Sequence, residues 1–176
     1  MAVTDPRLRR DQPVAARPPR ELISSSSHLL KRLSWVLKDL YGSAFEATGL
    51  TGPHYAVLAL LEEEPRETQA MIADALGYDR SHLVGLLDEL EERGLIERRR
   101  DPADRRRHLV TMTAEGRRTL HRLRKVVKRA DDEFLAPLDQ ERREALHGLL
   151  LLLVGYHEPR YAARSGQHLD SSEGSG

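Results

Sequence analysis

The chain has 176 residues, of which 39% are hydrophobic and 32% are charged, and it contains no cysteine. These proportions are typical of a soluble helical protein of one domain with tails. The missing cysteine excludes disulfides, thiolate metal sites and a thiol-based oxidation switch. The formal net charge is zero, but residues 117–129 hold seven cations and no acid. An uneven distribution of this kind leaves a polyanionic partner open.

The two ends of the chain are poor in apolar residues. Residues 1–21 are rich in Arg and Pro and residues 160–176 in Ser and Gly, so both are predicted to be disordered tails. The apolar run at 149–154 is too short to cross a membrane, and no apolar run follows Arg9-Arg10 as it would in a signal peptide. We therefore expect a cytoplasmic protein with no membrane partner.

The first part of the domain is predicted to be helical. A stripe of apolar residues at helical spacing, from Leu29 to Ala44, predicts a helix over residues 26–47. Thr51 as a cap and Pro53 at an early helical position then predict a second helix that runs toward Pro65.

The next segment is typical of a helix-turn-helix. Met71, Ile72, Ala75 and Leu76 recur at helical spacing after Thr68, and Gly77 is placed to end that helix in a left-handed conformation. Asp79 is a good cap for a second helix, which carries one apolar stripe and ends at Gly94; the stripe is Leu83, Leu86, Leu87 and Leu90. In such a motif the second helix is the one that reads DNA.

Residues 95–113 read LIERRRDPADRRRHLVTMT and predict a hairpin. Leu95-Ile96 and Leu109–Thr111 are apolar or β-branched enough to pair, and Pro102 requires a loop between them. The segment from Glu97 to Arg107 holds six arginines against three acids. A thin ribbon with such a tip suits a nucleic-acid groove, although a solvated surface hairpin is the plainer alternative. After a helix-turn-helix, the hairpin indicates a winged helix-turn-helix.

Two further helices are predicted after the wing. Thr113 caps a long helix over residues 114–136, which Pro137 ends, and a last helix covers residues 139–157. Together with the helix over 26–47, these helices have apolar faces with little left to cover in a chain of this size. A homodimer is therefore favoured over a monomeric bundle.

The order of these elements resembles the MarR family of transcriptional regulators over residues 24–156. The motifs that carry the resemblance are Leu90–Leu95 (LEERGL), Asp104-Arg105-Arg106, and Leu109-Val110 with Thr113 and Gly116. The resemblance implies a mainly α fold with a small β-hairpin, in which residues 22–159 hold a winged helix-turn-helix lobe (53–113) and N- and C-terminal dimerisation helices. It also implies a homodimer that binds double-stranded DNA at a pseudo-palindromic operator, as a ligand-responsive repressor associated with the nucleoid.

The helix over residues 80–92 is expected to enter the major groove with its first turn against the base edges, so Arg80, Ser81, His82 and Val84 are the candidates. Arg80 can pair bidentately with guanine, and Val84 can meet a thymine methyl group. The sequence departs from the family at Val84 and Gly85, where members often carry a polar and then a long basic residue. We therefore expect this helix to make fewer direct contacts with bases, and the wing to contribute more to recognition.

The resemblance also assigns roles on the wing. Arg106 is the residue that enters the minor groove, and Asp104 holds its orientation, although a turn-forming aspartate is an equally ordinary role. Arg98, Arg105 and Arg107 are expected to contact phosphates.

In the family an effector pocket lies between the DNA-binding lobe and the dimerisation helices, and its ligands are often aromatic acids. Trp35, Tyr41, His54 and Tyr55 lie on the helices that would line it. Plain packing is the alternative for Trp35 and an interface hydrogen bond for His54. A small aromatic or phenolic effector is therefore a candidate partner, and a protein without any ligand remains open.

No motif indicates an enzyme. The sequence has no phosphate-cradling glycine loop, no Gly-x-Ser-x-Gly elbow and no His-Glu-x-x-His, and its eight histidines show no metal-ligand spacing. We expect no cofactor, metal or catalytic activity. The alternative function is a winged-helix module that binds proteins and never touches DNA; the arginines of the hairpin argue against it.

Overall fold

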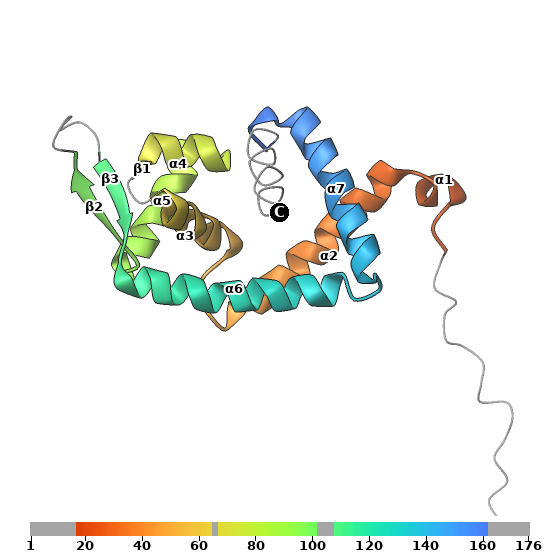
Figure 1. Cartoon of the computed structure of the whole chain (residues 1–176), viewed down its shortest axis with the longest axis horizontal. Helices are drawn as coiled ribbons and strands as arrows, with labels where there is room; N and C mark the ends of the chain where they lie inside the picture. The colour runs from red at the N-terminus through yellow and green to blue at the C-terminus, as the bar shows by residue number, and fades with distance from the viewer. Residues whose placement is uncertain (1–16, 65–66, 102–107, 162–176) are drawn as a thin grey trace, which may run out of the picture. The chain divides into compact units, whose positions relative to one another are not determined.

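The computed structural model of the chain describes residues 17–64, 67–101 and 108–161. Residues up to Lys38 and residues from Asp39 onward form two compact units. The elements of the described part, in chain order, are α1 (Arg20–Ile23), α2 (Ser26–Glu46), α3 (Gly52–Glu63), β1 (Glu67–Thr68), α4 (Gln69–Leu76), α5 (Arg80–Glu92), β2 (Ile96–Arg100), β3 (His108–Met112), α6 (Ala114–Phe134) and α7 (Gln140–His157) (Figure 1). The prediction of a mainly α fold with a small hairpin is confirmed.

The hairpin belongs to a three-stranded antiparallel sheet in the order β1-β3-β2. β2 pairs with β3 from Ile96 opposite Met112 to Arg100 opposite His108. The sequence predicted these two strands but not β1, in which Glu67 pairs with Val110. A strand of two residues is too short to show the alternation of apolar and polar side chains that marks a strand in a sequence.

The turns and caps around the helix-turn-helix are those that the sequence predicted. Gly77 ends α4 with a φ of 67°, in the left-handed region that glycine adopts without steric cost. The Asp79 carboxylate accepts a hydrogen bond of 2.8 Å from the backbone N–H of His82 at the start of α5. Thr113 Oγ1 caps α6 by accepting from Gly116 N at 3.0 Å, and it donates to the carbonyl of Gly94 at 2.7 Å. One side chain therefore joins the end of α5 to the start of α6.

Two helix boundaries differ from those expected from the sequence. Arg20 and Glu21, expected in the N-terminal tail, form the start of α1 after Pro19. α6 ends at Phe134, two residues before the expected end, because the chain tightens there into turns in which Ala136 N donates to Glu133 O and Leu138 N to Leu135 O. At the other end of the domain, Arg160 lies in the expected C-terminal tail.

Arg160 nevertheless has defined contacts. Its Nη1 donates to the carbonyl of Asp74, near the end of α4, at 3.2 Å. The same guanidinium lies so close to Gly77 that a Cβ there would be 2.5 Å from Nη2. The segment after α7 therefore touches the turn of the helix-turn-helix.

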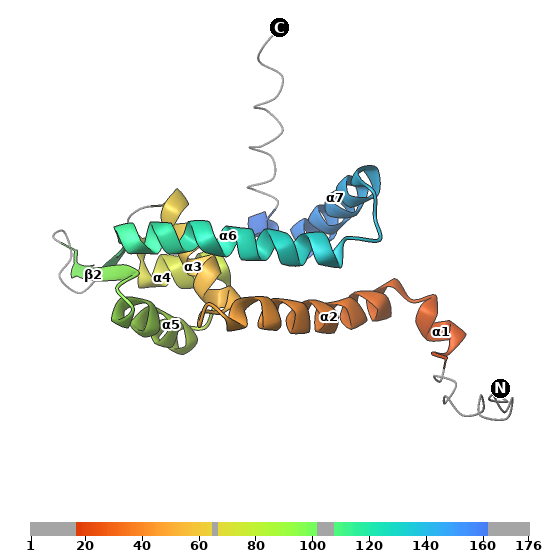
Figure 2. The ribbon, with the colours of Figure 1, turned by 90° about the horizontal axis from the view of Figure 1, so that it is seen from below.

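α3 lies at the centre of the core, with α5 and α6 on either side of it (Figures 1 and 2). Its buried side chains include Val57, Leu58 and Leu61. The largest fully buried side chains around them come from α4, α5, the sheet and α6: Ile72, Leu83, Leu87, Leu90, Ile96, Val110, Leu120 and Leu123. Met71, predicted to share the apolar face of α4, is 53% exposed, because the short α4 turns Ile72 and Ala73 inward instead.

α2 and α7 each expose a group of large apolar side chains. On α2 within the first unit these are Leu29, Leu30, Leu33, Trp35 and Val36; on α7 they are Leu149, Leu150, Leu152, Leu153 and Tyr156. α7 buries none of its residues. Exposed apolar faces of this extent are typical of surfaces that another chain covers. In the described part of the chain, no helix has the length and hydropathy needed to cross a membrane.

Gly116 provides a test of the packing between α6 and the wing. A Cβ at this position would lie 2.1 Å from the Leu95 carbonyl oxygen and 2.7 Å from Met112 Cγ. We expect Gly116→Ala to lower the free energy of unfolding by about 1–3 kcal/mol, because the extra methyl group overpacks a backbone contact that cannot give way. Chemical denaturation at a fixed protein concentration measures the change.

The matched control is Gly85→Ala. Gly85 is also helical, but a Cβ there meets no atom within 4 Å. Alanine should raise stability there by about 0.5–1 kcal/mol, since it is the better helix former. Equal effects of the two substitutions would contradict the packing described for α6.

Candidate nucleic-acid interface

The polar start of α5 is exposed because the opposite face of the helix is buried. Leu83, Leu86, Leu87 and Leu90 are all less than 9% exposed. Residues on the other side of a helix with such a stripe must face solvent. The first turn of α5, where the sequence placed the base-reading residues, is therefore open to a ligand.

Ser81 and His82 both bind the cap Asp79 of the same helix, Ser81 through its hydroxyl and His82 through its backbone N–H. Ser81 Oγ donates to Asp79 Oδ1 at 2.7 Å, and the His82 backbone N–H donates to the same oxygen. These two hydrogen bonds hold the pKa of Asp79 below its ordinary value, and the bond from Ser81 has the larger effect. The His82 ring packs edge-on against Tyr78 with 5.5 Å between the ring centroids. These two residues shape the turn before α5.

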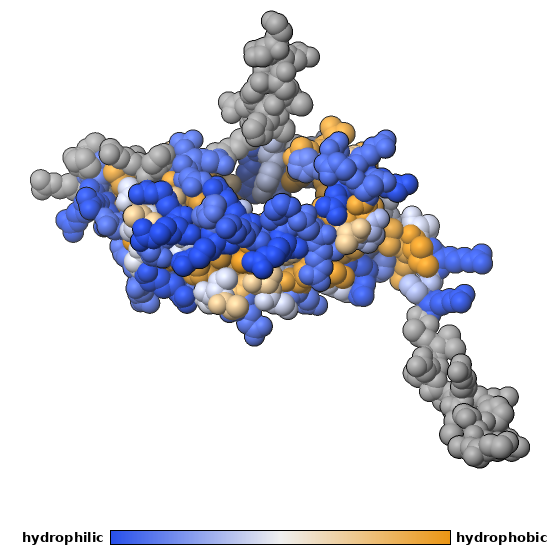
Figure 3. All heavy atoms as spheres, turned by 60° about the horizontal axis from the view of Figure 1, so that its bottom comes forward, coloured by the Kyte–Doolittle hydropathy of each residue, from blue (hydrophilic) through white to orange (hydrophobic). Residues whose placement is uncertain are grey.

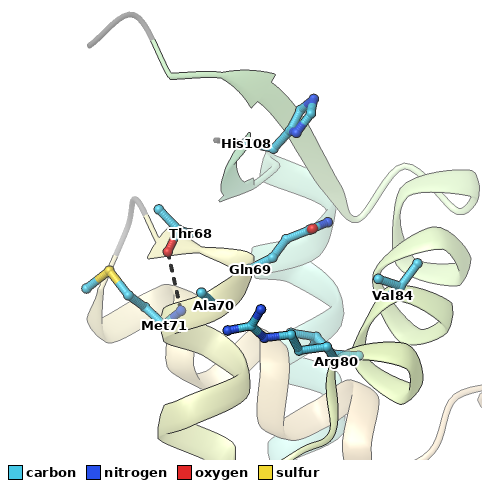
Figure 4. Close-up of a pocket in the computed structure, with 8 residues that line it drawn as sticks. Thr68, Gln69, Ala70, Met71, Arg80, Val84 and His108 are labelled. Atoms are coloured by element: carbon cyan, nitrogen blue, oxygen red, sulfur yellow. Dashed lines mark hydrogen bonds between the residues drawn. The ribbon is translucent and has the colours of Figure 1, made fainter. Parts of the chain in front are cut away.

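Arg80 and Val84 line a hollow of about 530 Å³ where α4, α5 and β3 meet (Figure 4). Its lining residues are Thr68, Gln69, Ala70, Met71, Arg80, Leu83, Val84 and His108. The sequence predicted Arg80 and Val84 as site residues but missed Gln69 and His108. No local signal could have found these two, because the sheet pairing β1–β3 is what brings the start of α4 beside β3.

Three polar side chains of this hollow are uncommitted. Within residues 17–64, 67–101 and 108–161, the side chains of Gln69, Arg80 and His108 have no hydrogen bond or ion pair. Figure 4 shows the Gln69 amide and the Arg80 guanidinium directed into the space between α4 and α5. The hollow can therefore offer donors and acceptors to a ligand without first breaking an internal contact.

Arg98, expected to contact phosphate, is instead paired inside the lobe. Its Nη1 lies 2.6 Å from Asp88 Oδ1, and its Nε donates to Glu91 Oε2 at 2.8 Å. The backbone N–H of Arg98 donates to the other oxygen of Glu91 at 3.0 Å. The hydrogen bond from the Arg98 side chain is the main reason that the pKa of Glu91 lies below its ordinary value. Arg98 thus joins β2 to α5, and its guanidinium is already paired within the lobe.

The remaining arginines of β2 are more accessible. Arg99 pairs with Glu97 at 2.7 Å, but its side chain is 78% exposed, and Arg100 is exposed at the end of the strand. Asp104, Arg105, Arg106 and Arg107 lie outside the described residues, so their roles stay predictions.

The exposed face of α6 is basic. It carries Arg117, Arg118, His121, Arg122, Arg124, Lys125, Lys128 and Arg129. Figure 3 shows hydrophilic side chains gathered along this helix. Several of its cations are paired: Glu115 binds Arg118 and Arg122, and Asp132 binds Lys128. The zero net charge of the chain therefore conceals a cationic surface that begins next to the wing.

The aromatic residues predicted to line an effector pocket pack closely. Tyr41 Oη donates to Asp131 Oδ1 at 2.5 Å, and burial, followed by this hydrogen bond, raises the pKa of Tyr41. Tyr41 stacks on Phe45, which contacts Tyr55 with 6.4 Å between ring centroids. Trp35 belongs to the first unit, where it is 49% exposed beneath the Arg32 guanidinium. None of these residues lines the hollow beside α5.

His54 belongs to α3 and is buried on the side that faces α5. Its Nδ1 accepts from the backbone N–H of Thr51 at 3.1 Å and so forms half of a capping box at the start of α3. Its Nε2 lies 3.2 Å from Glu89 Oε2, close enough for electrostatic attraction but out of line for a hydrogen bond. Burial lowers the pKa of His54, although the nearby Glu89 carboxylate acts in the opposite direction. The described part of the chain holds no group of three or more side chains suited to a metal ion.

Comparison with known proteins places the chain among bacterial regulators. A model of the MarR family matches residues 48–107. The chain is 39% identical to a putative transcriptional regulatory protein for the hcr operon of Thauera aromatica, over 58% of this chain and 61% of that protein. It is 36% identical to the transcriptional regulator HosA of Escherichia coli O111:H-, over 56% of this chain and 73% of HosA. The chain thus spans about three-fifths of the Thauera relative.

The transcriptional repressor CouR of Rhodococcus jostii RHA1 is similar in structure as well. Bound to a 23-mer DNA duplex, CouR superposes with a TM-score of 0.74 and 34% identity, over 80% of this chain and 99% of CouR. Bound to p-coumaroyl-CoA, it superposes with a TM-score of 0.67 and 32% identity, over 80% of this chain and 97% of CouR.

The lowered pKa of His54 predicts a pH dependence of stability. The folded protein takes up the proton less readily than the unfolded chain, so stability is full above the ordinary histidine pKa and falls as pH drops below it. The loss is at most about 1.4 kcal/mol per pH unit for this one group. His54→Gln retains a side chain that can complete the capping box but does not titrate, so its stability should depend less on pH.

Urea denaturation of both proteins between pH 7.5 and pH 5 measures the difference. The other seven histidines are common to both proteins. Parallel pH profiles would show that His54 titrates in the folded protein as it does in the unfolded chain.

Proposed function

The chain belongs to the MarR family of transcriptional regulators, and on this premise we propose that it binds a pseudo-palindromic operator in double-stranded DNA as a homodimer. The observation that carries the proposal is the exposed first turn of α5 beside a hollow whose polar side chains, Gln69, Arg80 and His108, are uncommitted. The arginine-rich wing continues from the same hollow at His108.

Recognition of the operator divides between the major and the minor groove. Arg80 pairs bidentately with a guanine and Val84 meets a thymine methyl group, while Ser81 and His82 hold the turn in shape. On the wing, Arg106 enters the minor groove, where the negative potential favours a guanidinium, and Asp104 orients it. Arg105 and Arg107 contact phosphates, which position the protein without reading sequence.

The structural relative CouR, solved on a DNA duplex, supports this function over a protein-interaction module. A module that binds only proteins would have no use for six arginines in and around the tip of the hairpin. CouR is a transcriptional repressor, and for this chain we likewise propose repression, by occlusion of a promoter. A protein with this role acts on the nucleoid.

Assembly as a homodimer follows from the apolar surfaces. α7 exposes Leu149, Leu152, Leu153 and Tyr156, and α2 exposes Leu29, Leu33 and Val36 within the first unit. Burying these faces against a second copy removes apolar area from water and stabilises the pair. Two copies related by a two-fold axis match a two-fold operator, with half-sites about one helical turn, or 34–36 Å, apart.

Operator binding is tested by two arginine substitutions. We expect Arg106→Ala and Arg80→Ala each to weaken binding about 5- to 150-fold without lowering the melting temperature. The expectation rests on the roughly 1–3 kcal/mol that a good contact to a base contributes. Affinity should also fall steeply with salt, because each phosphate contact releases counterions. Fluorescence anisotropy on the upstream region of the protein's own gene measures both effects.

Arg142→Ala is the matched control, because Arg142 is an exposed arginine that pairs with Asp139 at the start of α7, away from the basic face of α6. This variant should bind as the unmodified protein does. Salt-independent binding, or tight binding by Arg106→Ala, would overturn the proposed mode of recognition.

We further propose that a phenolic or aromatic acyl compound releases the protein from DNA. The complex of CouR with p-coumaroyl-CoA is the observation that favours this class of effector. Tyr41, Tyr55 and His54 provide aromatic surface and hydrogen-bonding groups in this chain, and Tyr41 Oη is already committed to Asp131. A ligand with a phenol or carboxylate can compete for that hydroxyl. Trp35 is the fourth candidate residue.

The effector is tested with p-coumaroyl-CoA, p-coumarate and CoA as separate probes. We expect a compound that carries the aromatic group to weaken operator binding about 5- to 150-fold, the usual range of coupling between two sites. Tyr41→Phe, which removes the hydroxyl, should reduce that response. CoA alone serves as the control. Unchanged affinity for DNA with all three probes would contradict this class of effector.

A further inference from the structure

We propose that Gln69 on α4 is a second base-reading residue and that it selects an A·T pair in each half-site. The inference rests on the proposed DNA binding and deepens it, because helix-turn-helix readout is expected from the second helix alone. In this protein the surface that can read bases extends onto the first helix of the motif.

The position of Gln69 carries the first step of the argument. Gln69 is the first residue of α4, directly after the cap in which Thr68 Oγ1 accepts from Met71 N. Its side chain is half-buried at the wall of the hollow, and Figure 4 shows the amide group between His108 of β3 and Arg80 of α5. A ligand that reaches Arg80 and Val84 therefore also passes the Gln69 amide.

The second step is that few side chains of α5 are available to read bases. Of the four residues expected to read bases, Ser81 donates its hydroxyl to the cap Asp79 and the His82 ring packs against Tyr78, so only Arg80 and Val84 line the hollow. At Gly85 a Cβ would meet nothing within 4 Å, so α5 leaves open space beside Val84. Two side chains per subunit are few for a specific site, and the hollow holds a further uncommitted group that can read a base.

The chemistry of the amide is the third step. A glutamine side chain offers one acceptor and two donors, the pattern that matches adenine N6 and N7 in the major groove. Within residues 17–64, 67–101 and 108–161, no hydrogen bond occupies this amide. The apolar side chains beside it, Ala70 and Val84, suit the methyl group of thymine. Donor, acceptor and apolar wall together favour an A·T pair.

The experiment is a selection from duplexes with randomised, two-fold related half-sites, carried out with the full chain, Gln69→Ala and Gln69→Glu. The unmodified protein should prefer adenine at one position of each half-site by about 5- to 150-fold. Gln69→Ala should lose that preference and keep the others. Gln69→Glu should shift the same position toward cytosine, because a carboxylate accepts from cytosine N4.

Gln140→Ala is the matched control. Gln140 is also the first residue of a helix, after the cap Asp139, and its amide donates to Glu144 on the exposed side of α7. It should select the same sequences as the unmodified protein. Circular dichroism melting of every variant checks that α4 remains folded.

Each outcome has a separate meaning. If the unmodified chain enriches no duplex, the proposed function itself fails. If Gln69→Ala binds every duplex more weakly by the same factor and keeps the preference for adenine, Gln69 contacts a phosphate and the inference is wrong. Unchanged preferences in Gln69→Ala would overturn it as well.

Discussion

The burial of one face of α5 is the constraint on which the rest of this lobe depends. Four leucines bind the helix to α3 and to the sheet, and they leave it one orientation. Because a helix has fixed angles between its residues, burying the leucines also determines that Arg80 and Val84 face the hollow. The orientation of these two side chains is thus a by-product of core packing, and a change in the core would turn them away from the hollow.

Arg98 is the polar counterpart of this packing. Asp88 and Glu91 stand one turn apart on α5, and both are bound by the guanidinium of Arg98 on β2. A half-exposed ion pair contributes little to stability by itself, but a planar guanidinium with two partners fixes an angle well. The arginine closest to α5 therefore aligns the wing with the helix, while Arg99 and Arg100 further along β2 are exposed.

The sequence predicted the turns and caps around the helix-turn-helix, which depend on local chemistry. Gly77, Asp79 and Thr113 mark turns and caps by their own side chains or by the lack of one, and the structure has all three where they were expected. It could not predict features that arise from contacts between distant segments. The pairing of β1 with β3, the place of Gln69 beside His108, and the capture of Arg98 by Asp88 and Glu91 all join residues whose relation appears only in three dimensions. The partners of Arg98 were not predicted for this reason: in a run of arginines, no local signal distinguishes the one that faces inward.

The contact of Arg160 with α4 has a consequence for the thermodynamics of assembly. Its guanidinium meets the carbonyl of Asp74 at the end of α4, and it comes from the segment that directly follows α7. A rearrangement of α7 when subunits associate would be transmitted through this arginine to the helix-turn-helix. Coupling between two binding equilibria is reciprocal. If dimerisation raises the affinity for the operator by some factor, binding of the operator must raise the stability of the dimer by the same factor.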